Sequence, residues 1–190
     1  MSRSVSIALV HFPVLDGKRA EVTTTVTNLD VHDLARSART FGCASYFIVH
    51  PVEAQRTLVG RIQEHWTTGS SAQRIPTRKV ALALVRVVPS LEAMVASFGG
   101  RDEVELWATA ARASREPLDF ASARALLATP GKPVVVLFGT GWGLAPQVID
   151  GVDALLPAIE RAPGVGEGDA YNHLSVRAAC AITLDRLLGG

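Results

Sequence analysis

The sequence predicts an α/β fold, a mostly parallel sheet with helices on both faces. Largely apolar runs of five or six residues, at 5–10, 44–49, 104–109 and 134–138, alternate with longer amphipathic segments. Strands that are apolar along their whole length are typical of a parallel sheet buried on both sides, and their alternation with helices is typical of βα units. At 190 residues the chain is long enough for one core, and we expect a single domain over residues 1–190.

Composition narrows the class of protein further. Hydrophobic residues make up 48% of the chain and charged residues 19%, as in soluble globular proteins. No apolar run reaches membrane-spanning length, and the short apolar stretch near the N-terminus lacks a signal peptide's cleavage site. We therefore expect a cytoplasmic protein without a membrane partner. The net charge of +1 leaves a nucleic-acid partner open, provided that the 19 basic residues cluster locally.

The elements follow in order along the chain. After the first strand and a turn at Asp16-Gly17, residues 30–41 show helical periodicity, with Asp30 as the expected N-cap and Gly42 as the residue after the helix. One side of this helix is apolar, and the other carries His32, Arg36 and Arg39. Further helices are predicted after His50-Pro51 to about 66, at 78–85, after Ser90, at 118–128 and after Asn172, with a polar loop at 67–76 and a short strand at 86–88.

Two glycine-rich loops enclose the most informative part of the sequence. The strand at 134–138 leads into Gly139-Thr140-Gly141-Trp142-Gly143, three glycines in five residues, and a second loop carries Gly164, Gly166 and Gly168. Glycine lets a backbone approach a ligand closely, so the pair suggests a site made of main-chain groups for a planar heteroaromatic ligand. On this interpretation, a side chain at Gly141 blocks the ligand and leaves the fold intact. The alternative is two ordinary surface loops.

Several common sites are not indicated. The glycines do not match the dinucleotide pattern, which needs G-x-G-x-x-G and a later acidic residue, and no phosphate-loop or G-x-S-x-G motif occurs. The five histidines are scattered without zinc spacing, so we predict no metal. Cys43 and Cys180 lie in apolar surroundings and are expected to be buried free thiols.

Structural explanations remain open for individual residues. His11 and His50, at strand ends, could simply bind backbone groups. Arg36 could form an ordinary surface pair with Asp33. Trp142 could be a packing residue, and Asn172 the N-cap of the last helix.

Taken together, the segments TNLDVHDLARSARTFG, FIVHP, LFGTGWGL and YNHLSVRAA resemble the SPOUT, or α/β-knot, methyltransferases. The likeness is to a bacterial family of S-adenosylmethionine-dependent RNA methyltransferases, whose members occur alone or fused to a tRNA guanine methyltransferase. The resemblance covers nearly the whole chain. It implies a C-terminal trefoil knot, a homodimer, bound S-adenosyl-L-methionine, and methyl transfer to a base or ribose of tRNA or rRNA.

The resemblance also implies site residues. Three loops, at 109–113, 138–143 and about 164–175, would bind the cofactor, with Leu137, Leu174 and Val176 beside its base. The implied cofactor-binding residues are Thr109, Ala110, Leu137, Phe138, Gly139, Thr140, Gly141, Trp142, Gly143, Gly164, Asn172, His173, Leu174 and Ser175.

The implied catalytic residues are Asp30, Arg36, His173 and Ser175, with Asp30 as base or acceptor-orienting group and Arg36 as phosphate or transition-state contact. Asp30 and His173 stand where the ribose-methylating branch has asparagine, which leaves a ring nitrogen open as acceptor. The expected RNA-binding residues are Arg36, Arg39, Arg74, Arg78 and Lys79. The alternatives are a dimeric cofactor- or RNA-binding module without turnover and a methyltransferase with a non-RNA substrate.

Overall fold

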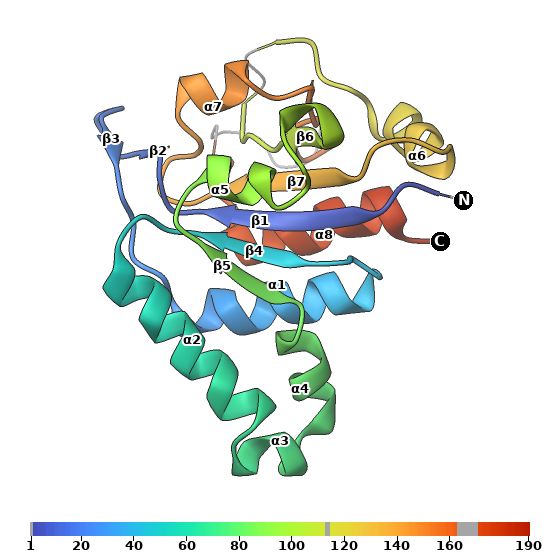
Figure 1. The fold of residues 1–190 in the computed structure, drawn as a ribbon. Helices are drawn as coiled ribbons and strands as arrows, with labels where there is room; N and C mark the ends of the chain where they lie inside the picture. Colours follow the sequence, from blue (N-terminus) through green and yellow to red (C-terminus); the bar gives the residue numbers. More distant parts are fainter. Residues whose placement is uncertain (1, 113–114, 163–170) are drawn as a thin grey trace.

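The computed structural model describes residues 2–112, 115–162 and 171–190, which form a parallel six-stranded sheet with helices on both faces (Figure 1). The predicted fold class is confirmed. The strand order is β5-β4-β1-β7-β6-β8. Their bounds are β1 Val5–Val10, β4 Tyr46–Val49, β5 Val85–Val88, β6 Glu105–Ala108, β7 Val134–Gly139 and β8 Ala154–Leu155. A small antiparallel pair, β2 Val14–Leu15 and β3 Glu21–Val22, follows β1.

Two apolar layers cover the sheet, one on each face. Along β1, Ile7 and Leu9 belong to one layer, whereas Ala8 and Val10 belong to the other, because successive strand side chains point to opposite faces. The first layer includes residues of α1 Asn28–Thr40, α2 Glu53–Thr67, α4 Pro76–Leu82, α6 Phe120–Ala128 and α8 Val176–Leu188. The second includes residues of α5 Leu91–Ala96 and α7 Pro146–Asp150. Short helices α3 Ser70–Arg74 and η1 Arg101–Glu103 complete the described elements.

Helix ends correct three sequence predictions. The N-cap of α1 is Thr27, whose side chain accepts from the Asp30 N–H at 3.2 Å, while its hydroxyl donates to the Asp30 carboxylate at 2.6 Å. The prediction of Asp30 as N-cap was wrong, because Thr27 caps the helix and Asp30 is the third residue of its first turn. Ser175, not Asn172, caps α8. The predicted loop at 67–76 contains α3, and α4 starts at Pro76.

The sheet's carboxyl edge is where a site is expected, since ligands of open α/β sheets bind beyond that edge. β1 and β7 are neighbours at the centre of the sheet, paired from Val5 with Val134 to Val10 with Gly139. Their ends place residues 11–27 next to residues 140–143. The predicted trefoil knot depends on residues 163–170, which lie outside the described residues. Within the described part of the chain, no helix is long and apolar enough to cross a membrane.

Candidate active site

The described parts of the three predicted cofactor loops lie together. The Asn172 side-chain amide donates to the Ala111 carbonyl at 3.2 Å, which links the third loop to the first. The rings of Trp142 and His173 are 5.5 Å apart, which links the second loop to the third. Thr140 binds the Val10 carbonyl through its N–H at 3.3 Å and its hydroxyl at 3.1 Å, fixing the second loop to the end of β1. Gly164 lies outside the described residues.

The glycines of the second loop serve different purposes. A Cβ at Gly139 would lie 2.6 Å from the Leu144 backbone nitrogen. A Cβ at Gly141, where φ is +59°, would lie 2.7 Å from the Leu15 carbonyl oxygen. At Gly143, where φ is +103°, nothing lies within 4 Å of the Cβ position. The chain's own backbone therefore requires the first two glycines, and open space for a ligand remains only at the third.

Side-chain direction corrects the predicted walls of the site. Leu137 and Phe138 are both buried in the core, on opposite faces of the sheet. Leu137 therefore cannot line a base, and both residues can contribute only main-chain groups. The Leu137 carbonyl already accepts the Thr109 N–H at 3.1 Å and the Thr109 hydroxyl at 3.0 Å. Leu174, 46% exposed, remains available as an apolar wall.

Asp30 is buried and tied to a residue that the sequence interpretation missed. One carboxylate oxygen accepts from the Arg177 guanidinium at 2.9 Å, and the other accepts the Thr27 hydroxyl. Arg177 also lies 3.6 Å from the Asp33 carboxylate. With both oxygens engaged, Asp30 is placed to orient Arg177, and the base role remains a prediction. Arg177 lies in the first turn of α8, and the local sequence gives no sign that its partner is Asp30.

Two buried histidines lie under the second loop. The His50 Nδ1 accepts the Val52 N–H at 3.1 Å, so its Nε2 carries the proton and donates to the Thr24 carbonyl at 2.9 Å. The His11 Nδ1 lies 2.9 Å from the Thr24 hydroxyl, which lies 2.5 Å from the Thr140 hydroxyl. Among the described residues the buried His11 Nε2 has no partner.

Both rings are neutral at pH 7. Burial, followed by the charge of His50, lowers the pKa of His11 to about 4. Burial also lowers the pKa of His50. The expectation that strand-end histidines bind backbone groups is confirmed for His50. His11 instead connects through two threonine hydroxyls to the second loop.

The predicted basic surface includes a hollow of about 340 Å³ between α1 and α4. We call it the arginine hollow; its seven lining residues are Arg36, Arg39, Thr40, Ile75, Thr77, Arg78 and Ala81. The lining holds three arginines and no acid, although the exposed Asp33 lies 3.9 Å from Arg36. His32 meets Trp66 edge-on at 5.4 Å, so this member of the predicted stripe packs between helices. Arg74 and Lys79 are exposed nearby, on α3 and α4.

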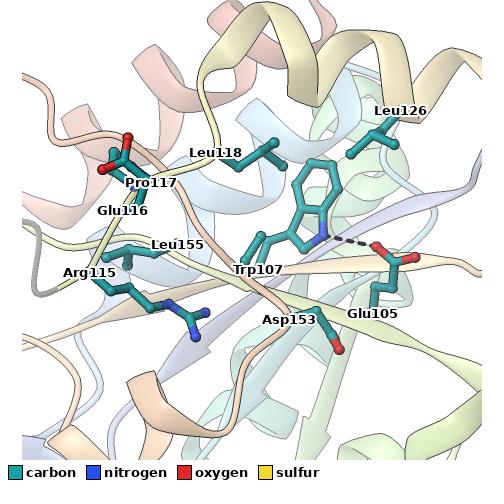
Figure 2. A pocket seen from close by; sticks show the side chains of 10 residues that line it. Glu105, Trp107, Arg115, Glu116, Pro117, Leu118, Leu126, Asp153 and Leu155 are labelled. Carbon is teal, nitrogen blue, oxygen red and sulfur yellow. Dashed lines mark hydrogen bonds between the residues drawn. The ribbon is translucent and has the colours of Figure 1, made fainter.

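A second hollow, of about 470 Å³, lies beside β6 and outside the predicted cofactor loops (Figure 2). Figure 2 shows the Trp107 indole beneath Leu118 and Leu126, with its Nε1 donating to Glu105 at 3.2 Å. Two of its three acids are paired elsewhere: Glu105 with Arg3 at 2.5 Å, and Asp153 with Arg101 at 2.8 Å. Since these charges are already compensated, we assign this hollow no role in the site.

Comparison with known proteins gives the chain's family. The profile of a family described as SAM-dependent RNA methyltransferase matches residues 4–189. A "tRNA (guanine-N(1)-)-methyltransferase" of Oleidesulfovibrio alaskensis is 41% identical over 189 residues, which are 98% of this chain but 42% of that protein. An uncharacterized protein of Aquifex aeolicus is 34% identical, over 98% of this chain and 89% of its own length.

Solved structures agree in fold. TrmJ from Z. mobilis has a TM-score of 0.60 at 17% identity, over 97% of this chain and 68% of that one. The A. aeolicus TrmH/SpoU tRNA modifying enzyme has a TM-score of 0.58 at 14% identity, over 98% and 74%. The chain spans less than half the length of the tRNA methyltransferase relative. Because the family profile matches nearly end to end, the chain belongs to the SAM-dependent RNA methyltransferase family.

Proposed function

We propose that this chain transfers a methyl group from S-adenosyl-L-methionine to a base or ribose of tRNA or rRNA. The observation that carries the proposal is the meeting of the predicted cofactor loops at the carboxyl edge of β7 and β1, through the Asn172–Ala111 and Thr140–Val10 bonds. The family match supports the same activity. The relative named tRNA (guanine-N(1)-)-methyltransferase, of which this chain matches 42%, supports tRNA as the substrate class.

The loops fit the cofactor in chemical character. The open space beside Gly143, the exposed Leu174 side chain and the loops' main-chain groups suit a flat heteroaromatic base. When bound, the cofactor supplies an electrophilic methyl group on a sulfonium. The loop's main-chain groups and the Leu174 side chain would hold it, and the methyl group would pass to an acceptor atom of the RNA, which would give up a proton.

The protein's own task is mainly to position the acceptor and manage its proton. Asp30 holds the Arg177 guanidinium at the start of α8, two residues after Ser175. In the proposed site this guanidinium contacts the acceptor, and Asp30 orients it. His173, exposed in the same loop, is the proposed boundary residue. The Ser175 side chain is already used as the α8 cap, accepting the Ala178 N–H at 3.2 Å.

RNA affinity is assigned to the arginine hollow together with Arg74 and Lys79. A cluster of guanidinium groups suits phosphate oxygens, which provide most of the affinity in such complexes. The arginine hollow lies on the α1 and α4 side of the sheet (Figure 1). Within one chain no described contact joins the hollow to the glycine loop. We therefore propose that Arg36 contributes to the site of another subunit.

We propose a homodimer for this reason. The trefoil knot and the cytoplasmic location are also part of the proposal. We place the interface on α1 and α8. Val31, Leu34 and Ala35 of α1 are buried inside the chain and are not open to a partner, whereas Leu29 is exposed and Ile182 is half-buried. A two-fold pairing through these helices brings Arg36 of one subunit toward the partner's glycine loop.

The decisive experiment measures transfer of tritium from labelled cofactor into RNA, protein and small-molecule fractions. We expect label in tRNA or rRNA. Label in protein or in small molecules would mean that the substrate is not RNA. Cofactor binding without transfer to any fraction would favour a binding module.

Complementation then tests the shared site. Arg36→Ala and Gly143→Val subunits, each inactive alone, should regain up to about a quarter of wild-type activity when mixed, because heterodimers contain one intact composite site. No recovery from mixtures shown to contain heterodimers would place Arg36 and the loop in one subunit.

A further inference from the structure

Three aromatic rings gather at the surface of the glycine loop. Trp142 is 57% exposed and Tyr171 is 71% exposed. The His173 ring lies between them, 5.5 Å from Trp142 at 71° and 5.1 Å from Tyr171 at 67°. Because Trp142 is 57% exposed in spite of this contact, much of its side chain stays open to solvent. Large apolar surface exposed in this way marks a contact site.

The backbone holds Trp142 in place. Its N–H donates to the Leu15 carbonyl at 2.8 Å, and the Gly143 carbonyl accepts the Leu15 N–H at 2.9 Å. The indole lies against Gly17, where a Cβ would come within 3.3 Å of its Nε1. An exposed side chain with this much backbone support loses little conformational freedom when a ligand stacks on it.

The turn that packs against the indole at Gly17 also carries two cations. Lys18 and Arg19 follow Gly17 directly and are exposed. Asp16 shapes this turn, accepting the N–H groups of Lys18 and Ala20 at 2.8 Å each, so its carboxylate is directed at the turn's own backbone. A flat aromatic face with neighbouring cations matches a ligand that is both planar and anionic, which a nucleotide is and the cationic cofactor is not.

We propose that Trp142 is a stacking surface for an RNA base that has left its helix, with Lys18 and Arg19 contacting the phosphate of that nucleotide. The inference rests on the proposed function and names the RNA side of the same site. It moves Trp142 from the predicted cofactor wall to the substrate. A base must leave its stack before an enzyme can reach a ring atom, and a ring at the edge of the cofactor loop is positioned to receive it.

The test compares Trp142→Phe, which keeps an aromatic ring, with Trp142→Leu, which keeps apolar volume but no ring. Leu126→Ala, an exposed apolar residue at the second hollow, is the control. Binding of a fluorescent tRNA transcript is measured by anisotropy, and cofactor binding by calorimetry. We expect Trp142→Leu to weaken tRNA binding roughly tenfold or more, Trp142→Phe to weaken it two- to threefold, and both to leave cofactor affinity unchanged. Lys18→Gln/Arg19→Gln should weaken tRNA binding and reduce its salt dependence.

The outcomes separate the inference from the function. If the wild type binds and methylates tRNA and Trp142→Leu does so equally well, the stacking surface is wrong and the function stands. If Trp142→Leu loses cofactor binding, the residue is a cofactor wall after all. If the wild type binds no RNA at any salt concentration, the proposed function itself fails, and the inference fails with it.

Discussion

The glycine loop at 139–143 and the basic residues of the arginine hollow were both predicted from short patterns. In the structure two of the loop glycines are packed against the chain's own backbone, whereas two of the hollow's three arginines are exposed. In the loop, Gly139 and Gly141 are required by neighbouring backbone at Leu144 and Leu15. In the hollow, the Arg36 side chain is 63% exposed and forms a 3.9 Å ion pair with Asp33. Substitutions in the loop should therefore act first on folding, whereas those in the hollow should act on a ligand.

The largest effect is expected at Gly141. Alanine there combines a positive φ with a Cβ 2.7 Å from the Leu15 carbonyl, and we expect it to lower the free energy of unfolding by about 2–4 kcal/mol. Gly143→Ala is the control without the clash; its φ of +103° is also unfavourable for alanine, and it should cost about 1–2 kcal/mol. Denaturant unfolding measures both. If both variants lose the same free energy of unfolding, the Leu15 backbone can move away from the added Cβ. Gly141 would then again be interpreted as a ligand-facing glycine.

The second effect is a loss of stability in acid. The pKa of His11 is about 4 in the folded protein, held down first by burial, against about 6.5 when unfolded. Between these values the unfolded chain binds a proton that the folded chain excludes, so stability falls as the pH drops from 6.5 to 4, by up to roughly 3 kcal/mol. His50 acts in the same direction. His11→Gln should flatten the dependence; an unchanged slope would assign it to other groups.

The third effect separates Asp30 from Asp33, which both face Arg177. Asp30→Asn weakens a 2.9 Å contact at a buried carboxylate and should cost about 1–2 kcal/mol of stability, with kcat falling more than cofactor affinity. Asp33→Asn, at an exposed 3.6 Å contact, should cost at most about 0.5 kcal/mol. Full activity in Asp30→Asn would remove Asp30 and its orientation of Arg177 from the mechanism.

The sequence was sufficient for the sheet, and the loops that it predicted for the site lie together, but it said less about what individual residues contact. Unbroken apolar runs define parallel strands, and the carboxyl edge then places the glycine loop. Periodicity cannot show that Gly141 faces Leu15 or that Leu137 points into the core, since these depend on register and loop path. Arg177 was missed because its partner, Asp30, lies 147 positions away, and no local pattern connects them.

The smallest effect on folding is expected in the arginine hollow, and its consequence should appear only with RNA. Arg36→Gln/Arg39→Gln removes two exposed charges and should change the free energy of unfolding by less than about 0.5 kcal/mol. If the hollow binds phosphate, tRNA affinity should fall, and the slope of its logarithm against that of salt concentration should decrease by about two. Arg61→Gln/Lys132→Gln, which removes the same charge from exposed positions outside the hollow, is the control. Identical slopes for the two double variants would mean that only net charge affects tRNA binding. The hollow would then not be a ligand site, and it would no longer differ in this respect from the rest of the surface.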